Sequence, residues 1–144
     1  MYEVPQFPRA KVVCVFRRTD EILVSETPDS VKGDTFWGPP GGGIEFGETA
    51  AQAAKREMLE ELGLHVENVQ QIGILENIFE YEGQRGHEIL FVLAATFVDK
   101  SLYAREAIDG IEGGRAFRLT WEPLRRFAND RRLVPDGLFS LLSR

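Results

Sequence analysis

The sequence predicts a layered α/β domain, and three observations lead to this fold class. Residues 50–62 have the composition and the end signals of one long helix. Apolar runs of strand length, at 10–17 and 21–26 before this helix and at 69–82 and 87–98 after it, are separated by turn residues. The C-terminal end carries short helical patterns. A chain that mixes strands and helices in this way buries its apolar faces by stacking helices on a sheet.

The segment before the long helix predicts three strands. The apolar runs at 10–17 and 21–26 are joined by a short polar turn, so we expect them to form a hairpin. Residues 27–34 contain Pro, Asp, Ser and Gly and are expected to be a surface loop, placed to form one wall of a pocket. A short strand begins at Phe36 and is ended by Pro39, because proline lacks the N–H that a strand ladder requires.

Local signals define both ends of the helix at 50–62. Thr49 is a good N-cap, and Gln52 completes a capping box three residues later. The interior consists of Ala, Gln, Lys, Arg, Glu, Met and Leu, all strong helix formers. Gly63 ends the helix, because glycine readily adopts the left-handed conformation past the last turn. The expected apolar stripe of this helix consists of Ala51, Ala54, Met58, Leu59 and Leu62.

The segment after the helix predicts two long strands followed by a loop. Residues 69–82 and 87–98 are expected to pair through a hairpin loop at 82–86. The second run is almost entirely apolar, which is typical of a central strand covered on both faces. Residues 99–114 are acidic and contain glycine, and they predict a long loop, either without regular structure or with one helical turn. The remaining expected elements are a strand at 115–121, a short helix at 122–127 and a C-terminal helix capped by Asp136.

Length and composition are those of a globular protein, and we expect residues 1–144 to form a single domain. Hydrophobic residues make up 43% and charged residues 28% of the chain, which is ordinary for this class. Residues 1–8 are expected to be an irregular lead-in. The sequence contains no long apolar run and no signal-peptide pattern, so we expect a cytoplasmic protein without a membrane segment. The single Cys14 lies in an apolar strand pattern and agrees with this location.

The net charge of −6 excludes some classes of partner. General nucleic-acid binding and anionic membrane binding both need a basic surface, so neither is expected. A small polyanionic substrate stays compatible with this charge if cations accompany it or meet it in the site.

Three glutamates lie on one face of the predicted helix. With about 100° per residue, Glu60 falls at about −60° and Glu61 at about +40° from Glu57. Like charges at these spacings destabilise a helix. The three glutamates also lie near the C-terminal end of the helix, where the helix dipole disfavours anions. Clustered hard oxygens are what Mg²⁺ or Mn²⁺ requires, with water and phosphate oxygens as the remaining ligands. The alternative interpretation of the glutamates alone is a solvated acidic helix face.

The sequence around these glutamates favours metal binding over a solvated helix face. Residues 42–64, called the box below, match the signature of the Nudix hydrolases at every fixed position, and a chance match is roughly one in a billion per start site. Trp37-Gly-Pro-Pro40 before the box and Glu45-x-Gly47-Glu48-Thr49 within it also resemble the family. The matching positions are Gly42, Glu48, Arg56, Glu57, Met58, Glu60, Glu61, Gly63 and Leu64.

The resemblance implies a Nudix fold, which is a mixed β-sheet sandwiched between α-helices, and metal-dependent hydrolysis of a diphosphate bond. By matching positions, Glu57, Glu60 and Glu61 resemble the metal ligands, together with the main-chain carbonyl of Gly41. The implied catalytic group consists of Arg56, Glu57 and Glu60. Arg56, four residues before Glu60, is placed to orient it by a charge-assisted hydrogen bond, unless the two form an ordinary surface pair.

Further carboxylates have less defined roles. Glu48 either binds a second metal or braces the glycine loop. The family often uses one more carboxylate outside the box as a base or ligand, and Glu88, Glu106 and Glu112 are the candidates. Each of these three is otherwise a solvated surface charge.

The sequence assigns no substrate-binding residue. Five aromatic residues near the box have the side chains needed to stack on a base, although core or rim packing explains most of them as well. Three basic residues lie in loops where they could meet a phosphate. The aromatic candidates are Phe36, Trp37, Phe46, Phe79 and Tyr81, and the basic candidates are Lys32, Arg85 and Arg115.

The substrate implied by the resemblance is a nucleotide or a nucleoside diphosphate derivative. The ADP-ribose type carries a proline downstream of the box, which is absent between Pro40 and Pro123, and the longer NADH-type motif is also absent. A MutT-like (deoxy)nucleoside triphosphate pyrophosphohydrolase is favoured by elimination. The alternatives are an ADP-ribose or dinucleotide pyrophosphatase and a non-catalytic nucleotide sensor, which usually loses box glutamates. Nothing in the sequence specifies the oligomeric state, and a homodimer is compatible with it.

Overall fold

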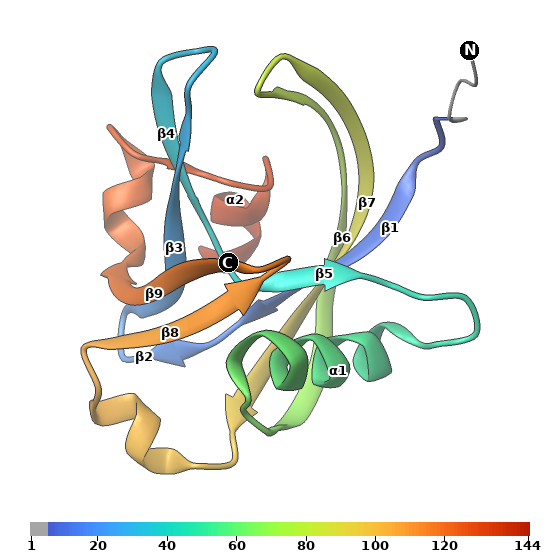
Figure 1. Ribbon diagram of the computed structural model, residues 1–144. Helices are drawn as coiled ribbons and strands as arrows, with labels where there is room; N and C mark the ends of the chain where they lie inside the picture. Colours follow the sequence, from blue (N-terminus) through green and yellow to red (C-terminus); the bar gives the residue numbers. More distant parts are fainter. Residues whose placement is uncertain (1–5) are drawn as a thin grey trace.

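The computed structural model describes residues 6–144, so most of the expected N-terminal lead-in lies outside the described residues. Two β-sheets form the body of the protein, and few helices cover them (Figure 1). This is the α/β arrangement with mixed sheets that the sequence predicted. No helix in the described part of the chain is long and apolar enough to cross a membrane. The strands of the first sheet, in spatial order, are β5 (Gly41–Gly43), β1 (Arg9–Val15), β7 (Gln84–Phe97) and β6 (Val66–Tyr81).

The second sheet contains six strands and is mostly antiparallel. Its strand β3 pairs with β2 as well as with its two neighbours in the main order. The strands, in spatial order, are β10 (Arg132–Leu133), β4 (Asp34–Gly38), β3 (Glu21–Asp29), β9 (Arg115–Pro123) and β8 (Ala107–Glu112), with β2 (Arg17–Arg18) on β3. The helical segments are α1 (Ala50–Leu62), η1 (Lys100–Ala104), η2 (Leu124–Ala128) and α2 (Leu138–Leu142).

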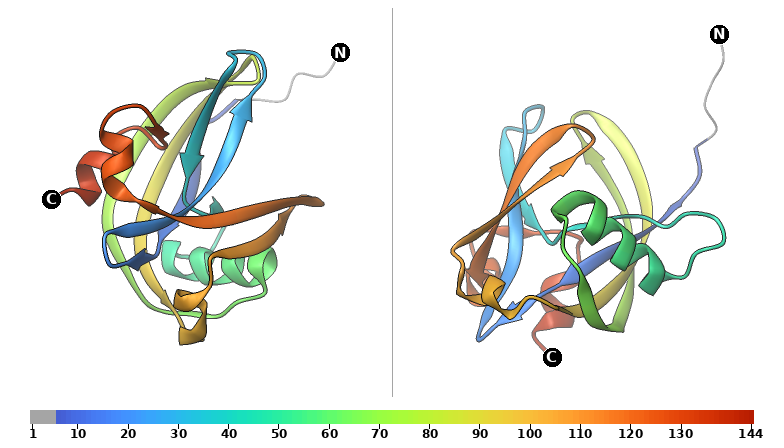
Figure 2. Two further views of the ribbon diagram at one scale, coloured as in Figure 1. Left: turned by 90° about the vertical axis from the view of Figure 1, so that its left-hand side faces the viewer. Right: turned by 60° about the horizontal axis from the view of Figure 1, so that its bottom comes forward.

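The first sheet is buried on both faces at its centre. Val12 and Cys14 of β1 face the core beneath α1, whereas Val13 and Val15 face a second core beneath α2 and η2. β7 lies between β1 and β6 and pairs with β1 in parallel, which confirms that its apolar run forms a central strand. The helix α1 packs against β1, β5, β6 and β8, so it lies where the two sheets come together (Figure 2).

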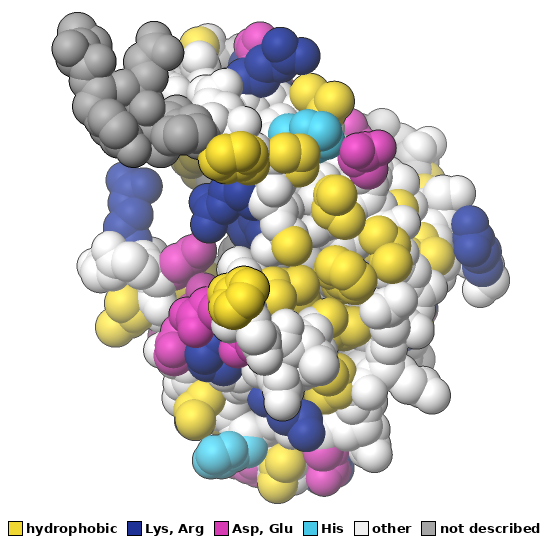
Figure 3. All heavy atoms as spheres, turned by 90° about the vertical axis from the view of Figure 1, so that its right-hand side faces the viewer, with side chains coloured by type: hydrophobic (Ala, Val, Ile, Leu, Met, Phe, Trp, Pro, Cys, Tyr) yellow, Lys and Arg dark blue, Asp and Glu magenta, His cyan; other side chains and the backbone are white. Residues whose placement is uncertain are grey.

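Part of the first sheet remains uncovered beyond the helix. β6 is an edge strand, and its Ile72, Ile74 and Ile78 are 37%, 53% and 58% exposed. Figure 3 shows apolar side chains gathered on this face of the molecule.

Two predicted elements before the helix differ from the structure. The hairpin between 10–17 and 21–26 was wrong, because β1 and β3 belong to different sheets and only Arg17 and Arg18 pair with β3. β1 is apolar on both sides and is therefore buried in the centre of the first sheet. The loop at 27–34 is shorter than predicted, since β3 continues to Asp29 and β4 begins at Asp34.

Two predictions near the C-terminus were also wrong. The loop at 99–114 contains η1 and the strand β8, which pairs with β9 through a turn at Gly113 and Gly114, both with positive φ. The C-terminal helix has Gly137 rather than Asp136 at its N-cap position and no side-chain cap, and the backbone N–H of Asp136 donates to the Asn77 side chain. The expected helix at 122–127 is the short 3-10 helix η2.

Candidate functional site

The helix α1 has the ends that its sequence predicts. The Thr49 hydroxyl accepts a hydrogen bond from the backbone N–H of Gln52 at 3.1 Å, and the Gln52 side chain accepts one from the backbone N–H of Thr49 at 2.8 Å. Gly63 ends the helix with φ of 68°. Met58 is fully buried, but Leu59 was wrongly assigned to the apolar stripe, since it is 47% exposed. These caps fix where the helix begins and ends, and its buried face, which includes Met58, fixes the direction of its glutamates.

The glycines of β5 allow the helix to lie close to the strand. A Cβ atom added to Gly42 would lie 2.2 Å from the carboxyl carbon of Glu57, and one added to Gly41 would lie 1.9 Å from the carbonyl oxygen of Val12. Any side chain at Gly42 would therefore displace the Glu57 carboxylate. The glycine turn predicted from the sequence is in fact a short edge strand that holds this carboxylate.

The pairing of β5 with β1 leaves two of its carbonyl groups directed away from β1. Hydrogen bonds join Ile44 to Ala10 and Cys14 to Pro40, so the antiparallel ladder uses every second residue of β5. Gly41 and Gly43 are the residues left out of this ladder. The Gly43 carbonyl accepts a hydrogen bond from Arg56, and the Gly41 carbonyl, the main-chain ligand implied by the sequence, points toward the same edge.

Arg56 lies at the centre of a hydrogen-bond network, which we call the Arg56 network. Its guanidinium donates two hydrogen bonds to the Glu48 carboxylate, at 2.6 and 2.9 Å, and one to the Gly43 carbonyl at 2.8 Å. It also donates to Glu57 at 2.9 Å and to Glu60 at 3.2 Å. The sequence predicted the contact with Glu60, but the structure shows that Glu48 makes the strongest contact. Arg56 therefore connects the loop, the edge strand and the helix.

Glu48 braces the loop before the helix. Its carboxylate also accepts a hydrogen bond from the backbone N–H of Glu45 at 2.9 Å. Hydrogen bonds from Arg56 and from this N–H lower the pKa of Glu48 from 4.5 to about 2. Of the two roles left open by the sequence, the brace is the one that these contacts support.

Glu61 lies in an environment that disfavours its charge. Burial, a hydrogen bond with Glu57 and the charges of Glu112 and Glu57 raise the pKa of Glu61 from 4.5 to about 8, against a smaller opposite effect of Lys11. Burial and the same carboxylates, Glu61 and Glu57, also raise the pKa of Cys14 to about 12. Two neighbouring carboxyl groups, Glu57 and Glu61, supply hard oxygen donors of the kind that a divalent cation prefers.

The described residues do not form a closed metal cage. Among residues 6–144, no group of three His, Cys, Asp or Glu side chains is arranged tightly enough to hold an ion. The carboxylates of Glu57 and Glu60 instead accept hydrogen bonds from the Arg56 guanidinium, and the Glu60 side chain is 60% exposed. The chemistry of the donors nevertheless fits a hard divalent cation, and the absence of a side chain at Gly42 leaves room for the Glu57 carboxylate.

Two cavities meet beside the box. The first has a volume of about 620 Å³ and lies over the glutamate face of α1, and the second has about 540 Å³ and extends between the two sheets. Both volumes are in the range of small-molecule sites. The residues that line both cavities are Lys11, Gly42, Glu61 and Glu112.

The three candidate carboxylates outside the box differ in which cavities they line. Glu112 lines both cavities and acts on Glu61, while Glu88 lines the second cavity and pairs with Lys11 at 3.1 Å. Glu106 lines neither of these two cavities. The sequence interpretation missed Lys11 and Arg9, although two cations in alternate positions at the start of an apolar run predict side chains on one face of a strand.

The second cavity contains part of the predicted aromatic set. The residues Phe36, Phe79 and Tyr81 line it. The rings of Phe36 and Tyr81 pack edge to face, with 5.7 Å between their centroids. Phe46 is fully exposed in the loop before the helix, and Trp37 packs on Phe127. Among the basic candidates, Lys32 lines the second cavity, whereas Arg85 and Arg115 line neither cavity.

A second polar network, which we call the clasp, joins two hairpin tips that border the second cavity. Asp29 is only 2% exposed, and its carboxylate accepts hydrogen bonds from the backbone N–H groups of Val31, Lys32 and Glu82. These bonds, led by the one from Lys32, lower the pKa of Asp29. The Glu82 carboxylate in turn accepts hydrogen bonds from the backbone N–H and the hydroxyl of Ser30.

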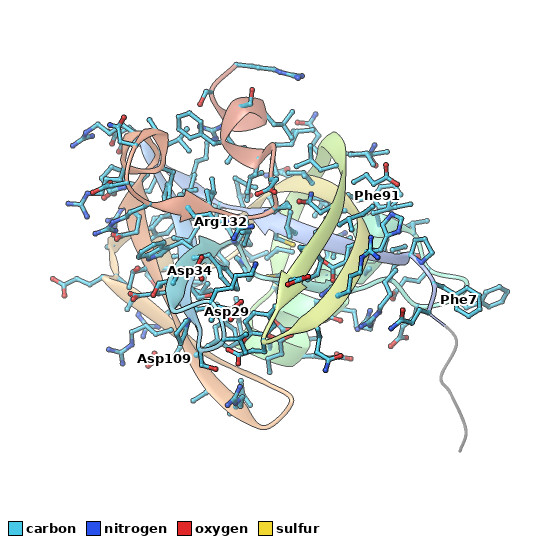
Figure 4. The ribbon with its side chains drawn as sticks, turned by 90° about the horizontal axis from the view of Figure 1, so that it is seen from above. Phe7, Asp29, Asp34, Phe91, Asp109 and Arg132 are labelled. Atoms are coloured by element: carbon cyan, nitrogen blue, oxygen red, sulfur yellow. The ribbon has the colours of Figure 1, made fainter. Side chains whose placement is uncertain are left out.

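The clasp connects the two sheets. Lys32 donates to the backbone carbonyl of Glu80 at 2.6 Å, so the β3–β4 hairpin is bound to the β6–β7 hairpin at several points. Figure 4 shows Asp29 on the side of its hairpin that faces β6 and β7. Asp29, Lys32 and Glu80 line the second cavity, so the clasp defines one of its walls.

Comparison with known proteins adds to this geometry. Residues 6–136 match the model of the NUDIX domain. The chain belongs to the Nudix family. It is 31% identical over 119 residues to a candidate mutator protein, MutT4, of Mycobacterium tuberculosis strain CDC 1551 / Oshkosh. That match covers 77% of this chain but only 45% of the mycobacterial protein, so this Nudix chain spans less than half the length of that relative.

Solved Nudix structures show the same fold. A MutT Nudix hydrolase from Burkholderia pseudomallei superposes with a TM-score of 0.69 at 24% identity, over 95% of this chain and 98% of that one. A hydrolase of ADP compounds superposes with a TM-score of 0.67 at 16% identity, over 96% of this chain and 72% of that one. These two structures differ in the activity that their names state, so the shared fold does not select a substrate.

Proposed function

We propose that this Nudix chain, as one domain, hydrolyses a diphosphate bond in a nucleotide or nucleoside diphosphate derivative. The observation that carries the proposal is the junction of the two cavities. The box carboxylates Glu57 and Glu61 lie at the first cavity, and the second cavity continues from Glu61 to aromatic side chains. A diphosphate at the junction with an organic group in the second cavity fits this arrangement.

Members of the Nudix family typically use a divalent metal, and Mg²⁺ or Mn²⁺ suits these donors. Glu57 and Glu61 would hold it, with Glu60 and the Gly41 carbonyl as further ligands. The bound ion supplies charge neutralisation at the phosphoryl oxygens and lowers the pKa of the attacking water. The absence of a side chain at Gly42, which leaves room for the Glu57 carboxylate, and the position of Glu57 and Glu61 in the same cavity support this assignment.

The remaining roles follow from contacts within the chain. Arg56 holds Glu57 and Glu60 on the helix face and fixes the loop through Glu48. Outside the box, Glu112 is the carboxylate best placed to accept a proton from water, because it lines both cavities. Glu88 is the second choice, because Lys11 engages it.

Within this class, a (deoxy)nucleoside triphosphate is the favoured substrate. The absence of the downstream proline and the sequence likeness to MutT4 support it. An ADP-ribose or dinucleotide pyrophosphatase is the second candidate, because a hydrolase of ADP compounds has the same fold.

A substrate panel tests the proposal. Deoxynucleoside triphosphates, their oxidised forms, ADP-ribose, dinucleoside polyphosphates and 5′-triphosphate RNA are incubated with the protein in Mg²⁺ or Mn²⁺, with a chelator as control. We expect the highest kcat/KM for a nucleoside triphosphate and no turnover with the chelator. Preference for ADP-ribose or a dinucleotide would select the second candidate. Tight nucleotide binding without any turnover would show a sensor instead.

A further inference from the structure

We propose that Lys11 binds the diphosphate of the substrate at the junction of the two cavities, and that Glu88 holds the Lys11 ammonium group there before substrate arrives. This inference rests on the proposed function and assigns a substrate contact to a residue outside the box. Of the four residues that line both cavities, Lys11 alone carries a positive charge, since Glu61 and Glu112 are acidic and Gly42 has no side chain.

The position of Lys11 follows from the strand pairing. β1 lies between β5 and β7, and Lys11 is opposite Gly43 on one side and Leu90 on the other. Lys11 therefore lies between the strand that holds the Glu57 carboxylate and the strand that carries Glu88. The side chain is 28% exposed, so its charge is accessible from the cavities but is partly shielded from bulk water.

The other cations near the cavities are engaged or lie elsewhere. Arg56 already donates to four partners in its network. Lys32 is bound to the Glu80 carbonyl in the clasp, and Arg132 lies 3.7 Å from Asp136. Arg9 lines the first cavity but not the second. Among the described cations, Lys11 is the one that lines both cavities, where a diphosphate that spans the junction would lie.

The pair formed by Lys11 and Glu88 is suited to exchange partners. A lysine ammonium has three donors, so it can contact phosphate oxygens while it keeps or releases a carboxylate. The pair is partly exposed at 28% and 18%, and such salt bridges contribute little to stability. The alternative role is a bridge that only links β1 to β7. In that case, loss of Lys11 would leave phosphate binding unchanged.

Binding of imidodiphosphate, a diphosphate analogue that is not hydrolysed, separates these roles. Calorimetric titration with imidodiphosphate in the presence of Mg²⁺ compares the affinity of the wild type with the affinities of Lys11→Met, Lys11→Arg and Lys100→Met. Lys100→Met is the matched control, because Lys100 also pairs with a glutamate, Glu67, at 2.9 Å but lies outside both cavities. Melting temperatures confirm that every variant is folded.

We expect Lys11→Met to weaken imidodiphosphate binding roughly tenfold or more, because a charge-assisted hydrogen bond is lost. Lys11→Arg should stay within about threefold and Lys100→Met should match the wild type. In kinetics, Lys11→Met should raise KM more than it lowers kcat. Glu88→Gln should weaken imidodiphosphate binding by a smaller factor than Lys11→Met, because the ammonium group remains but the carboxylate no longer holds it at the junction.

Equal imidodiphosphate binding by the wild type and Lys11→Met would overturn the inference, as would the absence of binding to the wild type. The two proposals fail in different ways. If nucleotides are hydrolysed normally by Lys11→Met, the inference is wrong and the proposed function stands. If the wild type hydrolyses no nucleotide, but its imidodiphosphate binding depends on Lys11, the proposed function is wrong and the phosphate contact stands.

Discussion

The Arg56 network and the clasp are both built from charged side chains, but they connect the chain over different distances. The Arg56 network joins residues 43 to 60, which are close in sequence. The clasp joins residues 29–32 to residues 80–82, across about fifty positions of the chain. The first network borders the cavity of the box glutamates, and the second borders the cavity between the sheets.

We propose that the two networks have different roles, one in catalysis and the other in the shape of the second cavity. The Arg56 network positions the groups that would bind metal, so changes in it should alter turnover more than stability. The clasp binds two sheets to each other, so changes in it should alter stability and the fit of the organic group. Each of the following variants tests one side of this division.

The largest effect is expected from Gly42→Ala. The new methyl group would lie 2.2 Å from the carboxyl carbon of Glu57 and would displace that carboxylate, so kcat should fall about 100-fold. Gly43→Ala is the control, since its nearest contact would be the Arg9 guanidinium at an ordinary 3.6 Å. Steady-state kinetics of both variants measure this difference. Similar activity of the two variants would contradict the role given to Gly42.

A smaller loss of activity is expected from Arg56→Lys. An ammonium group cannot reproduce the planar fork that contacts Glu48, Gly43 and Glu57 together, so kcat should fall roughly 10- to 100-fold. Arg118→Lys is the matched control, because Arg118 makes an exposed pair with Asp109 at 2.7 Å. If both variants kept wild-type turnover, Arg56 would be an ordinary surface arginine.

Asp29→Ala should reduce stability more than turnover, which is the reverse of the effect expected from the Arg56 variant. It leaves the backbone N–H groups of Val31, Lys32 and Glu82 without their acceptor, so the melting temperature should fall by roughly 5 °C or more. KM for a nucleotide should rise severalfold, while imidodiphosphate binding should stay unchanged. Thermal unfolding and calorimetry test the two halves of this prediction. A loss of imidodiphosphate binding would show that the two networks are not independent.

The smallest effect concerns acid stability. The folded pKa of Glu48 is about 2, below the ordinary value of 4.5, so its contribution to stability is complete above about pH 4.5 and is lost as the pH falls toward 2. Glu48→Gln should therefore be less stable than the wild type at pH 7, and the gap should narrow on acidification. Urea unfolding between pH 7 and pH 3 measures this gap. A gap that is constant with pH would contradict the charge pairing of Glu48 with Arg56.

The contrast between local and long-range contacts also explains which features the sequence could predict. The caps at Thr49 and Gly63 act within one helix, and the box glutamates share a face through helical periodicity alone, so local rules were sufficient. The long strands could be recognised from their apolar runs. Their partners could not, because whether β1 pairs with β3 or β7 depends on which faces become buried.

The clasp and Lys11 were beyond local rules for the same reason. Asp29 looks like a loop aspartate until the distant turn at Glu82 supplies an N–H group. Lys11 looks like a strand-end cation until β5 and β7 place it between two cavities. Both depend on contacts between segments that are far apart in sequence. In the box, by contrast, the functional groups and the rules that position them lie in one segment.

The most direct test of the account is the Mg²⁺-dependent turnover of a nucleoside triphosphate by the wild type and by Glu57→Gln, which keeps the size of the side chain but removes its charge. Melting temperature and Mn²⁺ binding are measured on the same samples. We predict that the variant stays folded, binds Mn²⁺ more weakly and loses at least about 100-fold in kcat. A folded Glu57→Gln variant with wild-type turnover would show that the box carboxylates are not the catalytic metal site.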